Sequence, residues 1–64
     1  MKVAILGLGS IGRRHARCFL AAGAEEVIGF DPTEDRRKQF EDEIGQKAHG
    51  GQHQVLDMRP DLVL

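Results

Sequence analysis

The sequence of 64 residues has little that could cross-link a small protein: it contains one cysteine, no tryptophan and no tyrosine. A lone Cys18 cannot form an internal disulfide, and no spacing of cysteine and histidine indicates a structural metal site. No apolar stretch approaches the roughly 20 residues of a transmembrane helix, so no membrane partner is expected. The formal net charge of −1 gives no reason to expect nucleic acid or an anionic membrane surface as a partner.

The single cysteine also indicates the cellular compartment of the protein. Unpaired cysteine is typical of reducing environments, and the N-terminal residues carry no convincing signal peptide, because glycines interrupt the apolar run and arginines follow it. Both observations favour a cytoplasmic protein.

Apolar runs alternate with helical patterns in the first 45 residues. Residues 2–6, KVAIL, form an almost uninterrupted apolar run, which is typical of a strand covered on both faces. Residues 26–30, EVIGF, repeat this pattern, and helices are predicted over 10–22 and from Thr33 to Gly45. Strand, helix, strand, helix in this order predicts an α/β fold with a parallel sheet, which is a partial Rossmann fold.

The first predicted helix has two contrasting sides. Ile11, Cys18, Phe19 and Ala22 fall on one side, which predicts that they are buried, with Cys18 as a packing residue rather than a nucleophile. Arg13, Arg14 and Arg17 cluster on another side. An arginine in the first turn opposes the helix dipole. Arg13 and Arg14 therefore either lie near an anion or are simply solvated.

Residues 46–64 are less regular. No third strand can be placed in residues 46–53, whereas 54–58 suggest a short helix and 61–64, DLVL, suggest a further buried strand. His49 and His53 have the i,i+4 spacing of a helical zinc site, but two glycines lie between them and argue against a helix. No metal site is expected.

The most informative stretch is GLGSIG at residues 7–12, which matches G-x-G-x-x-G between a predicted strand and a predicted helix. Gly7 permits the tight turn, Gly9 lets a pyrophosphate approach the backbone, and Gly12 allows close packing of helix on strand. The amides near Ser10 and Ile11 then face the anion at the helix N-terminus. The pattern predicts that Gly7, Gly9, Ser10, Ile11 and Gly12 bind a dinucleotide.

An acid follows the second strand. Asp31 lies 19 residues after Gly12, near the spacing of the residue that binds the adenosine ribose. A carboxylate there accepts both ribose hydroxyls and repels a 2′-phosphate, which predicts NAD rather than NADP. The structural alternative is that Asp31 forms an Asx turn or a helix-entry cap beside Pro32. Arg36 and Arg37 could reach a 2′-phosphate, but they are expected to face solvent on the second helix.

Three stretches, VAILGLGSIGRRHAR, VIGFDPTEDR and RPDLVL, together resemble the N-terminal part of the Gfo/Idh/MocA family of glucose–fructose oxidoreductases and inositol dehydrogenases. The resemblance implies a Rossmann domain followed by an α/β substrate domain, and NAD(P)-dependent hydride transfer on a hydroxyl-bearing carbon of a sugar or inositol. It also implies that the loop residues and Asp31 bind the cofactor, and that His15 matches a helix histidine to which no role is assigned. The lysine of a Glu-Lys-Pro motif and the acid/base histidine are absent, so no residue is predicted to be catalytic.

The last residues suggest a fragment. If 61–64 are the fourth strand, the chain ends before the loop that completes the cofactor crevice, and it leaves an apolar strand edge exposed. Residues 1–64 are therefore interpreted as the N-terminal part of a dinucleotide-binding Rossmann domain, with no second domain. The expected partners are a dinucleotide, the remainder of the Rossmann domain and a C-terminal substrate domain, and an oligomer is left open.

The leading hypothesis is the NAD-binding portion of an NAD(P)-dependent oxidoreductase. A non-catalytic dinucleotide-binding or sensing module is the first alternative, because the fold alone does not settle function. An FAD-binding Rossmann fragment is the second, because flavin enzymes share the glycine pattern followed by a small residue at the position of Ala16.

Overall fold

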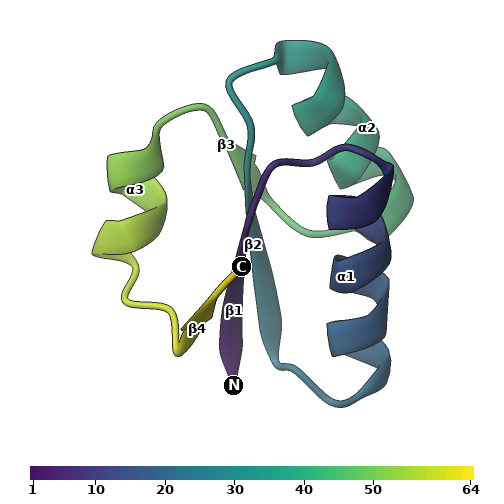
Figure 1. The fold of residues 1–64 in the computed structure, drawn as a ribbon, viewed down its shortest axis with the longest axis vertical. Coiled ribbons are helices and arrows are strands. Elements are labelled where there is room, and N and C mark those ends of the chain that lie inside the picture. The colour runs from purple at the N-terminus through teal and green to yellow at the C-terminus, as the bar shows by residue number, and fades with distance from the viewer.

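The computed structural model describes residues 1–64 as four strands and three helices that alternate along most of the chain (Figure 1). The elements are β1 (Lys2–Leu6), α1 (Ser10–Ala21), β2 (Glu26–Phe30), α2 (Glu34–Ile44), β3 (Ala48–His49), α3 (Gln52–Asp57) and β4 (Leu62–Val63). None of the three helices is long and apolar enough to cross a membrane.

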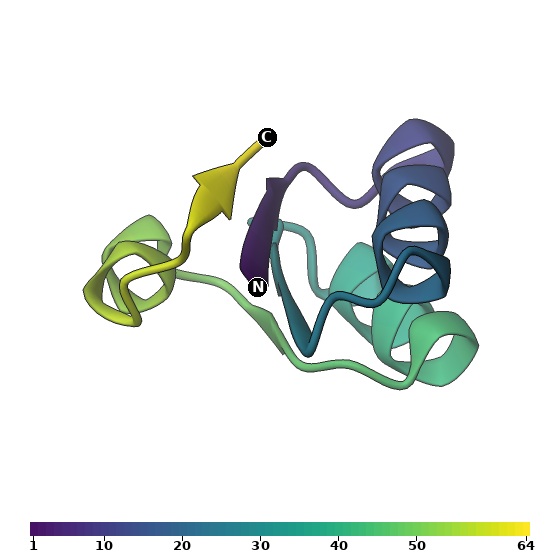
Figure 2. The same ribbon diagram turned by 90° about the horizontal axis from the view of Figure 1, so that it is seen from below.

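The strands form one parallel sheet in the order β3-β2-β1-β4. Helices α1 and α2 lie on one face of the sheet and α3 lies on the other (Figures 1 and 2). The chain passes from β1 outward through β2 to β3, and then crosses back to place β4 on the free side of β1. The predicted α/β, partial Rossmann fold is confirmed, and its topological switch point lies between β1 and β4.

The core lies on both faces of the two central strands, because successive side chains of a strand point to opposite sides. On the face covered by α1 and α2, six buried side chains pack together: Val3, Ile5, Leu8, Ala16, Val27 and Phe40. On the other face, a smaller cluster joins Ala4, Ile28 and Val55 under α3. Because β1 and β2 are buried on both faces, their apolar runs are almost uninterrupted, as the sequence predicts.

Helix α1 buries a side that agrees with the predicted one only at Phe19. Its buried residues are Gly12 and Ala16, with Phe19 and Leu20 packed against the same cluster. Ile11 is 70% exposed and Cys18 and Ala22 are also exposed, so the expectation that these three pack in the core is wrong. The two smallest residues of the helix face the sheet and let the helix lie close to β1. Close backbone approach, rather than the larger side chains, decides how α1 is oriented.

The C-terminal third corrects three further expectations. A third strand is present at Ala48–His49, and the short helix expected over 54–58 spans Gln52–Asp57 instead, after its N-cap Gly51. Strand β4 is present but is not buried, since Leu62 and Val63 are 37% and 41% exposed at the edge of the sheet.

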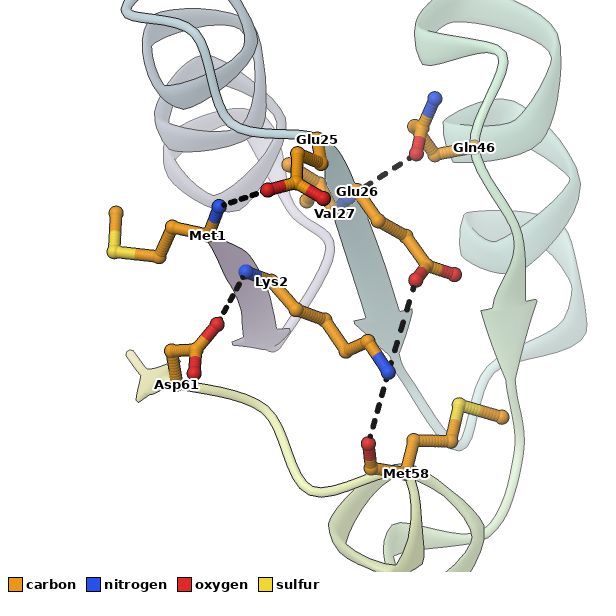
Figure 3. A network of polar contacts seen from close by, with 8 residues as sticks. All are labelled: Met1, Lys2, Glu25, Glu26, Val27, Gln46, Met58 and Asp61. Carbon is orange, nitrogen blue, oxygen red and sulfur yellow. Dashed lines mark hydrogen bonds and ion pairs between the residues drawn. The ribbon is translucent and has the colours of Figure 1, made fainter.

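Polar contacts of Lys2 hold β4 beside β1 (Figure 3). The amide of Lys2 donates to Oδ2 of Asp61 at 2.7 Å, and the amide of Asp61 donates to the carbonyl of Lys2 at 2.8 Å. The Nζ atom of Lys2 also donates to the carbonyl of Met58 at 3.1 Å, at the end of α3. This network fixes the start of β4, so that the residues after it reach the carboxyl end of β1.

Candidate functional site

A cavity of about 590 Å³ lies beyond the carboxyl ends of β1 and β4. Three elements and the loop between β1 and α1 contribute to it. The lining residues are Ile5, Leu6, Gly7, Gly9, Ser10, Ile11, Gly12, His15, Arg36 and Leu64. All five predicted residues of the glycine loop are among them, so the structure brings that part of the predicted site together.

The shape of the loop depends on two of its glycines. Gly7 has a φ of +97°, a conformation that side chains rarely adopt, and it makes the tight turn off β1. At Gly12 a Cβ atom would overlap the carbonyl oxygen of Gly7 and lie 3.3 Å from a methyl group of Ile5. The loop and the first turn of α1 therefore pack backbone against backbone, as the sequence predicts.

The loop leaves amide groups without partners. The first backbone hydrogen bond of α1 runs from the amide of Arg13 to the carbonyl of Gly9, at 3.0 Å. The amides of Gly9, Ser10, Ile11 and Gly12 donate to no atom of the chain. Because these amides lie at the positive end of the helix dipole and beside the cavity, they suit an anionic group.

Asp31 is 3% exposed and does not line the cavity, but its carboxylate accepts hydrogen bonds from the glycine loop and from the start of α2. Its Oδ2 atom accepts the amide of Leu8 at 2.9 Å, and its Oδ1 atom accepts the amide of Thr33 at 2.8 Å. The second contact is the Asx turn named as the structural alternative. Burial opposes ionisation, but the amides of Leu8 and Thr33 and the guanidinium of Arg36 outweigh it and hold the pKa of Asp31 below its usual range. Its role as a ribose ligand stays a prediction.

Arg36 was expected to face solvent, with contact to a 2′-phosphate as the alternative, and the structure places it at the cavity. It lies in the first turn of α2, and its side chain is 57% exposed. One nitrogen is 3.8 Å from Oδ2 of Asp31, and the same nitrogen is 3.8 Å from the position that a Cβ atom of Gly9 would occupy. A signal was present in the sequence, because the start of α2 follows the carboxyl end of β2, which lies beside that of β1.

The anion beside Arg13 is the carboxylate of Glu43, a residue of the chain itself and not a bound ligand. Its NH1 atom donates to the carbonyl of Leu8 at 3.0 Å, and its Nε atom lies 2.9 Å from Oε2 of Glu43 on α2. The second contact is an ion pair without hydrogen-bond alignment. A hydrogen bond from Gln39, followed by the charges of Arg13 and Arg17, holds the pKa of Glu43 below its usual range. Arg13 therefore braces the glycine loop against α2 and does not line the cavity.

Other candidate residues do not gather into a site. No group of three histidine, cysteine or acidic side chains is placed to hold a metal ion. His49 lies in β3 and His53 in α3, on opposite sides of the glycine pair. His15, which had no assigned role, lines the cavity.

Comparison with known proteins identifies a family. A family model described as NADP oxidoreductase, coenzyme F420-dependent, matches residues 2–64. No curated protein and no solved structure matches the chain. The predicted membership of the Gfo/Idh/MocA family is therefore wrong. The glycine loop and the acid after β2 are general features of dinucleotide-binding folds, and they do not separate one family from another. The expected sugar or inositol substrate depended on that resemblance and has no other support.

Proposed function

The chain belongs to the family of coenzyme F420-dependent NADP oxidoreductases, and from this premise we propose that its cavity binds the pyrophosphate and adenosine portion of NADP. The observation that carries the proposal is the set of four unpartnered amides, from Gly9 to Gly12, at the cavity wall. A pyrophosphate placed there receives hydrogen bonds that the chain itself leaves unused, in the favourable field of α1.

Gly9 supports close approach of the phosphate. It has no side chain between its backbone and the cavity, and a Cβ atom there would meet only the guanidinium of Arg36 within 4 Å. Access to the backbone is what the second glycine of this motif provides.

The choice of NADP over NAD depends on Arg36 and Asp31. The carboxylate of Asp31 is buried and already accepts two amides, and the charge of Arg36 lies beside it. Arg36 is half-exposed at the cavity, and an arginine guanidinium is well suited to a phosphate monoester. We propose that Arg36 binds the 2′-phosphate, and that the predicted preference for NAD is reversed by this contact.

The family description supplies the second redox partner. Coenzyme F420 would exchange a hydride with the nicotinamide ring of NADP, as the description of the family implies. The unpartnered amides and Arg36 at the cavity suit phosphate groups, and no side chain of the chain is assigned to coenzyme F420. The role of these residues is to bind and orient the dinucleotide.

Calorimetric titration of the protein with NADP, NAD and FAD tests the proposal. We expect saturable binding of NADP that is tighter than binding of NAD, and no binding of FAD. Tighter binding of NAD would restore Asp31 as the residue that selects the cofactor. Binding of FAD alone would revive the flavin alternative, and binding of none of the three would overturn the proposed function.

A further inference from the structure

The cavity has two ends that differ in chemistry. Arg36, from α2, lies at the end beside β2, whereas Leu64 lies at the end beside β4. In doubly wound folds the dinucleotide crosses the sheet at the switch point, which here lies between β1 and β4. If Arg36 holds the adenosine end, as in the proposed function, the nicotinamide end lies toward β4.

Helix α1 places His15 on the β4 side of the cavity. Arg13 and Arg17 both contact Glu43, so this side of α1 faces α2. His15 is two residues from each arginine, which is about 200° around a helix, and therefore lies on the side away from α2. Ile11, four residues earlier, shares that side and also lines the cavity.

The direction of the side chain brings the imidazole to the amide cluster. In a helix the Cα–Cβ bond tilts toward the N-terminus, so the side chain of His15 covers the preceding turn. That turn contains Gly12, which has no side chain to obstruct it. His15 is exposed, and its side chain makes no hydrogen bond or ion pair within the chain.

We propose that His15 binds the nicotinamide half of the dinucleotide, donating a hydrogen bond to the phosphate or ribose on that side. The inference rests on the proposed function and extends it, because it assigns a residue to the half of the ligand that the glycine loop and Arg36 do not reach. Arg36 then fixes the adenosine end, and His15 fixes the end that carries the reacting ring.

Two ligands separate this inference from the proposed function. NADP contains both halves, whereas adenosine 2′,5′-bisphosphate contains only the adenosine half. We expect His15→Ala to weaken NADP binding about tenfold, the effect of roughly one charge-assisted hydrogen bond, and to leave the bisphosphate within about twofold of the native value. Arg14→Ala is the matched control, because Arg14 is an exposed neighbour outside the cavity, and it should change neither affinity.

His15→Gln provides a readout that loss of structure would not reproduce, because glutamine keeps a side-chain hydrogen-bond donor. We expect His15→Gln to retain more of the affinity for NADP than His15→Ala does. The inference would be overturned if His15→Ala weakened binding of NADP and of the bisphosphate equally, or if it left the affinity for NADP unchanged. Failure of the native protein to bind either ligand would overturn the proposed function as well.

Discussion

The carboxylate of Asp31 accepts the amide of Leu8 at 2.9 Å and thereby joins the end of β2 to the glycine loop, 23 residues earlier in the chain. The same carboxylate holds Thr33, the N-cap of α2, through its other oxygen. One buried charge therefore positions both the loop that lines the cavity and the helix that carries Arg36. The acid after β2 organises the site whether or not it contacts the ligand.

This relationship predicts how stability depends on pH. Because the folded-state pKa of Asp31 is lowered, its contribution is fully present above its unfolded pKa of about 3.9 and is lost as the pH falls through the folded value. Urea unfolding should show stability falling below about pH 4. Asp31→Asn should cost about 2 kcal/mol at pH 7 and show a smaller fall in acid. An unchanged acid profile in the variant would contradict this role. Glu43→Gln is the comparison: the pKa of Glu43 is also lowered, but because this carboxylate lies on the surface, its loss should cost less stability than that of Asp31.

Gly12 is predicted to be essential for folding rather than for binding alone. A methyl group at this position overlaps the carbonyl oxygen of Gly7, and backbone atoms cannot move aside cheaply. Gly12→Ala should lower the free energy of unfolding by about 3 kcal/mol, the upper range for overpacking. Chemical denaturation measures the change. Gly51→Ala is the control, because a methyl group there meets only the flexible side chain of Gln54, and its stability should stay near that of the native protein.

Gly9 is predicted to affect binding and not folding. Its φ is −70°, and a Cβ atom would meet only Arg36 at 3.8 Å, so alanine fits without strain. The added methyl group projects to where the phosphate should approach. Gly9→Ala should therefore weaken NADP binding at least tenfold, or by about 1.4 kcal/mol, while its melting temperature stays within a few degrees of the native value. Native affinity in this variant would show that the phosphate does not contact the backbone at Gly9.

Arg36 is predicted to select NADP. Arg36→Ala should weaken NADP binding about tenfold and change NAD binding much less, because only NADP carries the phosphate monoester. Competitive titration with the two dinucleotides measures the ratio of their affinities. Lys38→Ala is the matched control, since Lys38 lies two residues further along α2 and pairs with Glu34 away from the cavity. If Arg36→Ala weakened the affinities for NADP and NAD by the same factor, Arg36 would act through its charge in general and not by binding the 2′-phosphate.

Local patterns predicted most of the first half of the fold. The apolar runs predicted the bounds of β1 and β2 correctly, because strands buried on both faces contain almost no polar residues that interrupt the run. Gly23 follows the helix predicted over 10–22, Gly45 ends the second predicted helix, and both have positive φ. The glycine loop was identified because its chemistry depends on consecutive backbone positions, which a sequence displays directly.

The remainder depended on tertiary contacts. Helix α1 buries Gly12 and Ala16 instead of Ile11 and Cys18, because packing distance outweighs side-chain hydrophobicity at that interface. The third strand has only two residues, too few for periodicity to detect. The order of β2 and α2 in a parallel sheet allowed Arg36 to be considered for the cavity, but a local pattern could not decide between that contact and solvent. Family membership was mistaken because the shared motifs describe the fold and not the reaction.

The central claim is that the unpartnered amides at the start of α1 hold the phosphates of a dinucleotide. Its most direct test is a titration of isotopically labelled protein with NADP, followed by the ¹H–¹⁵N amide resonances. The account predicts that the largest shifts belong to Gly9, Ser10, Ile11 and Gly12, and that they saturate together with the calorimetric binding curve. Saturable binding that leaves these four amides unshifted, with the changes confined to another surface, would contradict it.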